Sequence, residues 1–461
     1  MLGFVQNWLA PRCNPIGIDF GSDCLRVAQV QWTGEEYKLL AAASADVPPH
    51  VRTDPNRRWA FFIETVRDLL VQAPFRGRQV TLALPASTMF VRHLRMPKLD
   101  EDGMKKALPW ELRGKLPIDP MNAVLRHVVA GEVYQDSEPK YEVIVMAASK
   151  EMVNQMLAAA SRAKLDVVGM NVEPKALIDC FTHVYRRKSD EVATSCFVDI
   201  GCSASRAVIA RGQDMLFGRV IPIGGDQFSR AVAESLKITH QDAKILRVKL
   251  CAQQSPEDAK ATIQPERAVV AAAPAASATS ATDPTGDNSF ALLDSAMRKA
   301  TPAPTPAPAP LPVAAPIEAN NDGIDPVDST EAQRVNQACR EPLRRLVEEL
   351  NMCRRYYEST FPEKPIDRLI FVGGEARQRQ LCQQVAREMG LAAQVGDPLV
   401  RIGRISEIGI ESGIDRRQPQ PAWAVAIGLS MGPRSAATPV AVAAAEDQTH
   451  GEPQTQQNTR G

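Results

Sequence analysis

Hydrophobic and polar residues follow two different periods along this chain. Short apolar runs, continuous or alternating, are typical of β-strands. Such runs lie at 15–22, 26–32, 80–85, 90–97, 141–149, 166–174, 368–374 and 392–395. Apolar residues spaced three or four apart are typical of amphipathic helices. Such stretches lie at 57–73, 150–163, 226–236, 240–250, 331–359, 376–389 and 423–431. Because strands and helices alternate, the pattern predicts an α/β protein.

One further helix carries its own start and stop signals. Asp100 stands before an acidic first turn, as a typical N-cap does. Pro109 lies inside the stretch and is expected to kink it, and Pro117 is expected to end it, because proline cannot continue a helix. We therefore predict a helix over about 101–116.

The second half of the chain repeats the organisation of the first. Residues 196–225 read as three strands joined by turns at Gly201, at Gly212 and at Gly224–Gly225, and a helix follows them. Residues 15–32 begin in the same way, with a strand, a glycine turn and a second strand. We therefore expect a duplicated α/β unit.

Charge and cysteine content exclude several classes of protein. The chain has 54 basic and 54 acidic residues, so it lacks the positive surplus with which nucleic-acid-binding proteins neutralise phosphates. Its 9 cysteines form no CxxC pair, so we expect neither a structural metal site nor a disulfide framework. No apolar run is long enough to span a bilayer. We expect a cytoplasmic protein that binds no nucleic acid.

Three segments combine a buried strand with a glycine turn. They are IGIDFGSDCLR at 16–26, FVDIGCSAS at 197–205 and FVGGEAR at 371–377. Glycine lets backbone N–H groups approach a phosphate closely, and hydroxyl groups or a cation beside them add ligands. A carboxylate can hold hydrated Mg²⁺. One such turn is common in proteins, but two on equivalent strands, with a third that opens a helix, predict a nucleotide site.

This arrangement resembles the actin, Hsp70 and hexokinase superfamily, in which two related lobes each offer a hairpin to the phosphates. A closer resemblance is to the PilM family, the actin-like proteins of type IV pilus assembly. The motifs that carry it are MNVEPKALIDC (170–180), IPIGGDQFSRAVAESL (221–236), YYES (356–359) and RLIFVGGEARQRQL (368–381). Proteins of the PilM family carry a small subdomain inserted into the first lobe, and the actin-like cell-division family FtsA has the same insertion. The resemblance covers about 16–250 and 331–432.

The resemblance implies an α/β, actin-like fold of two lobes, each an RNase H-like domain, with a small inserted α/β subdomain. Residues 253–330 and 433–461 are expected to be disordered, because Ala/Pro-rich and polar segments bury too little apolar surface to fold. The expected domains are an N-terminal segment (1–15), the first lobe (16–87), the inserted subdomain (88–170), a connecting helix (171–195), the second lobe (196–252), the linker (253–330), the rest of the second lobe (331–398), a return to the first lobe (399–432) and the tail (433–461).

The resemblance also implies an ATP site with Mg²⁺. The expected ATP-binding residues are Asp19, Gly21, Ser22 and Arg26 in a first phosphate loop, Asp199, Gly201, Ser203 and Ser205 in a second, Gly225 and Arg247 beside the nucleoside, and Gly373, Gly374 and Glu375 in an adenosine turn. Asp19 and Asp199 are expected to hold Mg²⁺ through water. Glu173 lies where relatives keep a polar residue near the γ-phosphate, and it is the candidate catalytic residue of at most a weak ATPase.

Three functions remain open at this point. PilM-like proteins are ATP-binding scaffolds that take the short cytoplasmic tail of PilN, a single-span inner-membrane protein, in a groove beside the inserted subdomain. Self-association through that subdomain is an alternative role for it. An FtsA-like division protein would end in a basic amphipathic helix, which 433–461 lacks. A small-molecule kinase of the same superfamily would need a catalytic carboxylate facing its substrate, and no aspartate stands at the right place.

Overall fold

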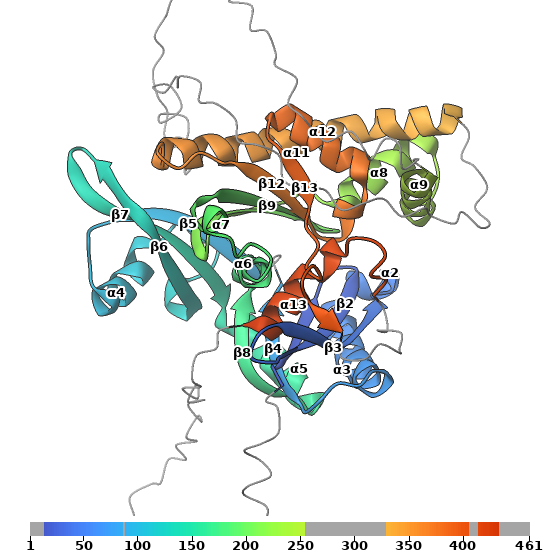
Figure 1. The fold of residues 1–461 in the computed structure, drawn as a ribbon, viewed down its shortest axis with the longest axis horizontal. Helices are drawn as coiled ribbons and strands as arrows, with labels where there is room; N and C mark the ends of the chain where they lie inside the picture. Colours follow the sequence, from blue (N-terminus) through green and yellow to red (C-terminus); the bar gives the residue numbers. More distant parts are fainter. Residues whose placement is uncertain (1–12, 86–87, 254–328, 405–413, 433–461) are drawn as a thin grey trace, which may run out of the picture.

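A computed structural model describes residues 13–85, 88–253, 329–404 and 414–432 (Figure 1). Most of the predicted N-terminal segment, almost all of the predicted linker and the whole predicted tail lie outside the described residues, so these remain predictions. The described parts form two lobes and a smaller unit that is attached to both of them.

The first lobe is built on a six-stranded sheet with the strand order β14-β3-β2-β1-β4-β8. Strands β1, β2 and β3 form an antiparallel meander. On the other side of β1, β4 pairs with it in parallel, and β8 pairs in parallel with β4. The strands are β1 (Ile16–Phe20), β2 (Cys24–Trp32), β3 (Tyr37–Asp46), β4 (Gln79–Leu84), β8 (Asp166–Val172) and β14 (Gly403–Arg404). All five residues of β1 are buried, as its continuous apolar run predicts.

The second lobe repeats this topology. Its sheet has the order β11-β10-β9-β12-β13, again an antiparallel meander followed by two parallel strands. The strands are β9 (Thr194–Ile200), β10 (Ser205–Arg211), β11 (Asp214–Ile221), β12 (Arg368–Val372) and β13 (Ala393–Val395). Thus β1 and β9 are equivalent central strands, and the predicted duplication is confirmed.

Helices cover both sheets. Helices α3 (Pro55–Gln72) and α5 (Lys150–Arg162) pack on the outer face of the first sheet, and α8 (Gly225–Leu236), α9 (His240–Gln253), α11 (Ser329–Thr360) and α12 (Arg379–Met389) belong to the second lobe (Figure 1). Two short helices are α2 (Pro49–Arg52) and α7 (Lys188–Val192). No helix within the described ranges is both long and apolar enough to cross a membrane.

Helices α6 (Glu173–Thr182) and α13 (Ala424–Met431) lie together between the two lobes. Their close approach depends on glycine, because a Cβ on Gly428 would lie 1.9 Å from the carbonyl oxygen of Ala176. A Cβ on Gly17 in β1 would lie 2.0 Å from the carbonyl oxygen of Ala426. The last described helix therefore packs directly against the first strand.

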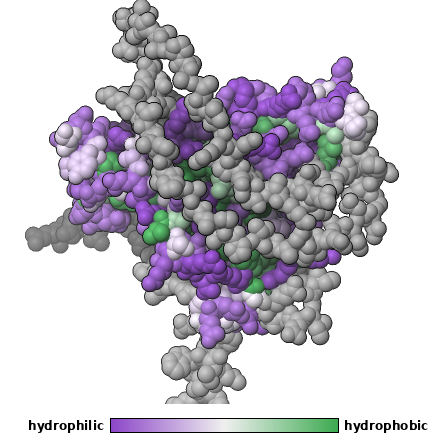
Figure 2. All heavy atoms as spheres, turned by 45° about the horizontal axis from the view of Figure 1, so that its top comes forward, coloured by the Kyte–Doolittle hydropathy of each residue, from purple (hydrophilic) through white to green (hydrophobic). Residues whose placement is uncertain are grey.

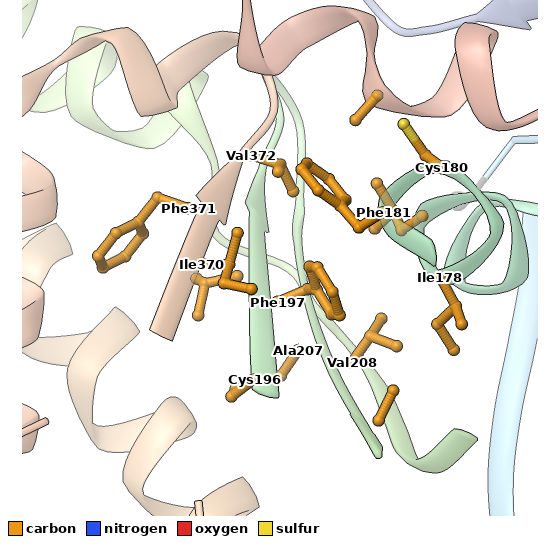
Figure 3. Packing of buried hydrophobic residues seen from close by; sticks show 14 of the residues in the cluster. Ile178, Cys180, Phe181, Cys196, Phe197, Ala207, Val208, Ile370, Phe371 and Val372 are labelled. Carbon is orange, nitrogen blue, oxygen red and sulfur yellow. The ribbon is translucent and has the colours of Figure 1, made fainter. Parts of the chain in front are cut away.

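The main hydrophobic core joins α6 to the second sheet, and Figure 3 shows this contact at close range. Phe181 of α6 points toward Phe197 of β9, with ring centroids 5.3 Å apart. On the face drawn in Figure 2, hydrophilic residues dominate the periphery of the described surface, and hydrophobic residues show mainly toward the centre. The lobes thus share buried apolar surface through α6.

The inserted unit is a three-stranded sheet of order β5-β7-β6 covered by α4. Its elements are β5 (Met89–Met96), α4 (Glu101–Glu111), β6 (Ala123–Gln135) and β7 (Glu138–Ser149). Asp100 caps α4 as predicted, accepting from the backbone N–H of Gly103 at 2.9 Å, and Pro109 lies within the helix. The helix ends at Glu111, however, one turn and more before the predicted stop at Pro117.

The boundary of the inserted unit also differs from the prediction. The strand β8 was expected within an insert over 88–170, yet it pairs in parallel with β4 and completes the first sheet. Its partner helix α5 packs on α3 of the first lobe. The insert's own sheet therefore ends at Ser149, because β8 finds its hydrogen-bonding partner in the first lobe.

Candidate functional site

The first predicted phosphate loop joins β1 to β2. Asp19 is buried near the end of β1, directly opposite Arg26 of β2 in the strand register. The carbonyl oxygens of Gly21 and Ser22 accept from the guanidinium of Arg58, each at 3.3 Å. Since these carbonyls are held by Arg58, the loop has a defined shape before any ligand arrives.

The second predicted loop joins β9 to β10 and is backed by two glycines. Gly201 N–H donates to the Ala204 carbonyl at 3.1 Å and closes the turn, and Gly225 N–H donates to the Gly201 carbonyl at 2.9 Å. A Cβ on Gly224 would lie 2.6 Å from the carbonyl oxygens of Gly201 and Cys202. Only glycine at Gly224 lets the N-terminus of α8 approach the loop so closely.

The two serines of this loop differ in their surroundings. Ser203 is exposed at the tip of the turn. Ser205 is fully buried, and its hydroxyl donates to the Ile223 carbonyl at 2.6 Å. Ser203 can therefore offer a hydroxyl to a ligand directly, whereas Ser205 holds the loop against the short segment between β11 and α8.

The third glycine turn packs against the second loop. Gly373 has φ +89°, a left-handed conformation that favours glycine, and a Cβ there would lie 2.3 Å from Asp199 Oδ1. Its N–H donates to the Pro421 carbonyl at 3.1 Å. Gly374 and Glu375 follow in a short 3₁₀ helix, Gly374–Arg377. Two predicted turns far apart in the chain are thus neighbours.

A buried charge cluster lies where the two lobes meet. Arg206 of β10 donates through Nη1 to Asp199 Oδ2 at 2.6 Å, and its Nε forms an ion pair with the Glu173 carboxylate at the start of α6. Asp19 belongs to the same cluster, because its charge acts on Glu173 and Arg206. The predicted residues Asp19, Asp199 and Glu173 therefore come together.

Arg206 is a site residue that the sequence analysis did not identify. Its signal is present in the chain, because Arg206 lies opposite Asp199 in the β9–β10 register as Arg26 lies opposite Asp19 in the β1–β2 register. Each hairpin thus has an aspartate on its first strand and an arginine seven residues later. A comparison of the two hairpins, position by position, would have identified Arg206.

Burial dominates the electrostatics of this cluster. It raises the pKa of Glu173 to about 8, with Arg206 opposing the shift and the charges of Asp19 and Asp199 adding to it. Burial likewise raises the pKa of Asp19 to about 6, although Arg26 and Arg206 oppose that shift. The pKa of Arg206 is raised by Glu173 and Asp199 in spite of its burial. Two guanidinium groups, those of Arg206 and Arg26, therefore offset part of the cost of burying these acidic groups.

A second group of predicted residues meets on the other side of the second loop. Arg247 of α9 is buried and binds Glu375 Oε2 at 2.6 Å through Nη2. Its Nη1 donates to the Gly225 carbonyl at 2.9 Å. A small cavity of about 60 Å³ adjoins Arg247, lined by residues of α8, α9, α11 and α12 that include Phe228, Cys339 and Gln378.

The two lobes also contact each other across the mouth of the site. Lys244 Nζ of α9 lies 3.3 Å from Asp23 Oδ2 in the first loop. Arg52 of α2 contacts the Cys202 sulfur of the second loop, with Nη1 3.9 Å from Sγ. The loops of both lobes are therefore held together at the surface as well as at the buried cluster.

The carboxylates of the cluster offer no direct metal site in this arrangement. Within the described ranges, no three His, Cys, Asp or Glu side chains converge so that they could bind a metal ion. One oxygen of Asp199 is bound by Arg206, and the other packs against Gly373. A water-held Mg²⁺ at Asp199 would therefore lie beside the Arg206 guanidinium.

Two sheets of one topology, two helices packed together between them and three glycine turns at their junction define an actin-like protein. A family model described as type IV pilus assembly protein PilM matches residues 17–266, just over half of the chain. The chain belongs to this PilM family and is an actin-like protein of type IV pilus assembly.

A solved structure with a TM-score above 0.5 shows the same fold. A structure described as the PilM-PilN type IV pilus biogenesis complex is similar with a TM-score of 0.63 at 20% identity, covering 91% of this chain and 98% of the matched chain. The ethanolamine utilization protein EutJ from Carboxydothermus hydrogenoformans matches with a TM-score of 0.45 at 11% identity, covering 92% of this chain and 90% of its own.

Proposed function

We propose that this protein is an ATP-binding scaffold of type IV pilus assembly, which works in the cytoplasm and is held at the inner membrane by a PilN-like protein. The observation that carries the nucleotide part is the packing of Gly373 against Asp199, because it brings the third turn beside the second phosphate loop. Gly225, Arg247 and Glu375 extend the same surface through their mutual contacts.

In this proposal the phosphates bind between the two hairpin turns. Gly21, Ser22 and Arg26 serve from the first lobe, and Gly201 and Ser203 from the second. The adenosine binds at Gly373, Gly374 and Glu375, beside Gly225 and Arg247. Mg²⁺, held through water at Asp19 and Asp199, would supply positive charge to the phosphates.

Glu173 fits a slow ATPase better than a fast enzyme. A general base needs a carboxylate oxygen within reach of the water whose proton it takes. Burial raises the pKa of Glu173 to about 8, and its carboxylate is already engaged by Arg206. Glu173 is thus placed to hold the cluster together, and any role in activating water would be weak.

The proposed partner is the cytoplasmic tail of a PilN-like single-span protein. The similarity to a PilM-PilN complex supports this choice of partner. Strand β8 is an edge of the first sheet, on the side from which the inserted unit departs, and its Val168 is exposed. An edge strand can pair with an extended peptide, whose alternate side chains then enter apolar pockets.

Hydrogen exchange on the intact protein tests the partner site. A synthetic peptide matching the tail of the cognate membrane protein is expected to bind with a roughly micromolar Kd, or about −8 kcal/mol, and to protect β8 and the facing part of the insert. A scrambled peptide is the control. Protection confined to segments outside the first lobe and the insert would contradict this site, and concentration-dependent protection without peptide would indicate self-association instead.

A further inference from the structure

We propose that Arg206 is an internal counter-cation which occupies the place of a divalent metal ion among the carboxylates of the cleft. The proposal rests on the proposed nucleotide site, since it concerns what that site needs from solution. It predicts that Mg²⁺ does not stabilise the nucleotide-free wild-type protein, and that removing Arg206 creates a Mg²⁺ site where there was none.

The first argument is the geometry of the pairings. One guanidinium contacts two carboxylates from different parts of the chain, Asp199 of β9 and Glu173 of α6. The side chains of both carboxylates are 4% exposed, and that of Arg206 is 13% exposed. A planar, permanently charged fork is suited to bridging two carboxylates in this way.

The second argument is the balance of charge. Asp19, Asp199 and Glu173 are three buried acidic groups within reach of one another's charges. Buried carboxylates are tolerated only when they are paired. In metal-dependent sites a divalent ion meets this need, whereas here Arg206, together with Arg26 opposite Asp19, meets it from within the chain.

The third argument is the place that Arg206 already occupies at Asp199. Asp199 Oδ2 accepts from Arg206 at 2.6 Å. A divalent ion bound through water at Asp199 would lie close to this guanidinium, and the repulsion between the two cations disfavours the metal ion. In the nucleotide-free protein, Arg206 therefore takes the position that a metal ion would otherwise hold.

The fourth argument is the matching arginine of the first lobe. Arg26 stands opposite Asp19 as Arg206 stands opposite Asp199. The duplicated hairpins thus bring two guanidinium groups to the cleft, one from each lobe. Two such groups supply positive charge to the cleft of the nucleotide-free protein, where a divalent ion would otherwise be needed.

The test uses the full chain, no nucleotide and Mg²⁺ alone as the probe, read out as the melting temperature. The wild type is expected to show no response to MgCl₂ beyond that to choline chloride of equal ionic strength. Arg206→Gln is expected to melt lower and to recover by several degrees in millimolar MgCl₂, with a Mg²⁺ affinity at least tenfold above that of the wild type.

The matched control is Arg219→Gln. Arg219 lies on the neighbouring strand β11 and pairs with Glu349 at 2.9 Å outside the cleft. Its loss is expected to lower the melting temperature without any Mg²⁺-specific recovery. Should Arg206→Gln be too unstable to purify, the double variant R206Q/E173Q, which removes one of the carboxylates left unpaired, gives the same readout.

Two results would overturn the proposal. One is an Arg206 variant that is folded and indifferent to Mg²⁺, and the other is a wild type that binds Mg²⁺ alone as tightly as the variant does. Because no nucleotide is present, the outcome is independent of the proposed ATP site. A chain that never binds ATP can still pass this test, and a chain that binds ATP can fail it.

Discussion

The Tyr356 hydroxyl donates to the Glu142 carboxylate at 2.6 Å and so joins the long helix of the second lobe to the middle strand of the inserted unit. Glu142 is completely buried, and its carboxylate also lies 3.1 Å from His93 Nδ1. On its other side His93 contacts the Gly218 carbonyl of β11 at 3.1 Å. The insert is therefore fixed to the second lobe through polar side chains as well as through its covalent attachment to the first.

Replacing Tyr356 by Phe tests this attachment. The change removes one of the two hydrogen-bond partners of a buried carboxylate oxygen, the other being His93, which costs about 1–3 kcal/mol. We expect that loss in the free energy of unfolding by urea. Tyr185→Phe is the control, since that hydroxyl makes an exposed bond with Gln394 at 2.7 Å and its removal should cost less than about 0.5 kcal/mol. Equal losses in both variants would show that the buried bond has no special weight.

Replacing Gly428 by Ala tests the packing of α13 on α6. The new methyl group would lie 1.9 Å from the Ala176 carbonyl oxygen, a backbone atom that cannot yield locally. We expect a loss of about 3 kcal/mol or more, the range of severe overpacking. Gly169→Ala in β8 is the matched control, because its methyl group would meet Thr81 Cγ2 at an ordinary 3.7 Å. A wild-type melting temperature for Gly428→Ala would contradict the arrangement of these helices.

Replacing Asp19 or Asp199 by Ala tests the proposed phosphate site. We expect either change to weaken Mg-ATP binding tenfold or more, about 1.4 kcal/mol, in calorimetry. Asp214→Ala, an exposed carboxylate in the β10–β11 turn, serves as the control. Unchanged ATP affinity in both cleft variants would remove the basis of the two-loop site.

The buried His183 predicts how stability depends on pH. Burial lowers the pKa of His183 from 6.5 to about 4, against the opposing effect of backbone hydrogen bonds that include the Val400 carbonyl. The unfolded chain therefore binds more protons than the folded one between these values, and stability falls as the pH drops from 6.5 to 4. The full effect is about 3 kcal/mol. The free energy of unfolding, measured in urea at several pH values, should change less between pH 6.5 and 5 for His183→Gln than for the wild type. An equal change in both proteins would refute the assignment.

The core strands could be predicted because they are buried on both faces. Strands such as β1 and β9 read as continuous apolar runs, and burial along their whole length explains why. Strand β6 was not predicted, because buried, half-buried and exposed residues follow one another in it without a regular alternation. Helix α4 ends before Pro117, so its end depends on packing in the insert rather than on the proline.

The glycine turns of the site were visible in the chain, while its pairings were not. Glycine marks a tight turn wherever it occurs, so the loops at Gly21, Gly201 and Gly373 could be located from local sequence. The contact of Lys244 with Asp23 joins residues from different lobes, and no local pattern reports it. Arg206 could not be found from a local pattern, but it could be found by comparing the repeats, because it follows Asp199 at the same spacing as Arg26 follows Asp19.

The packing of α13 against β1 has a consequence for biosynthesis. The ribosome completes β1 long before α13, and at roughly 5–20 residues per second the delay is about 20–80 s. During that time the face of the first sheet that α13 will cover stays uncovered in the nascent chain, while the insert and the second lobe emerge. The first lobe is thus begun first and finished last. A ribosome that stalls or terminates before Ala424 would release a chain whose first lobe and helix α6 lack their packing partner, and such a chain is a natural substrate for chaperones and proteases.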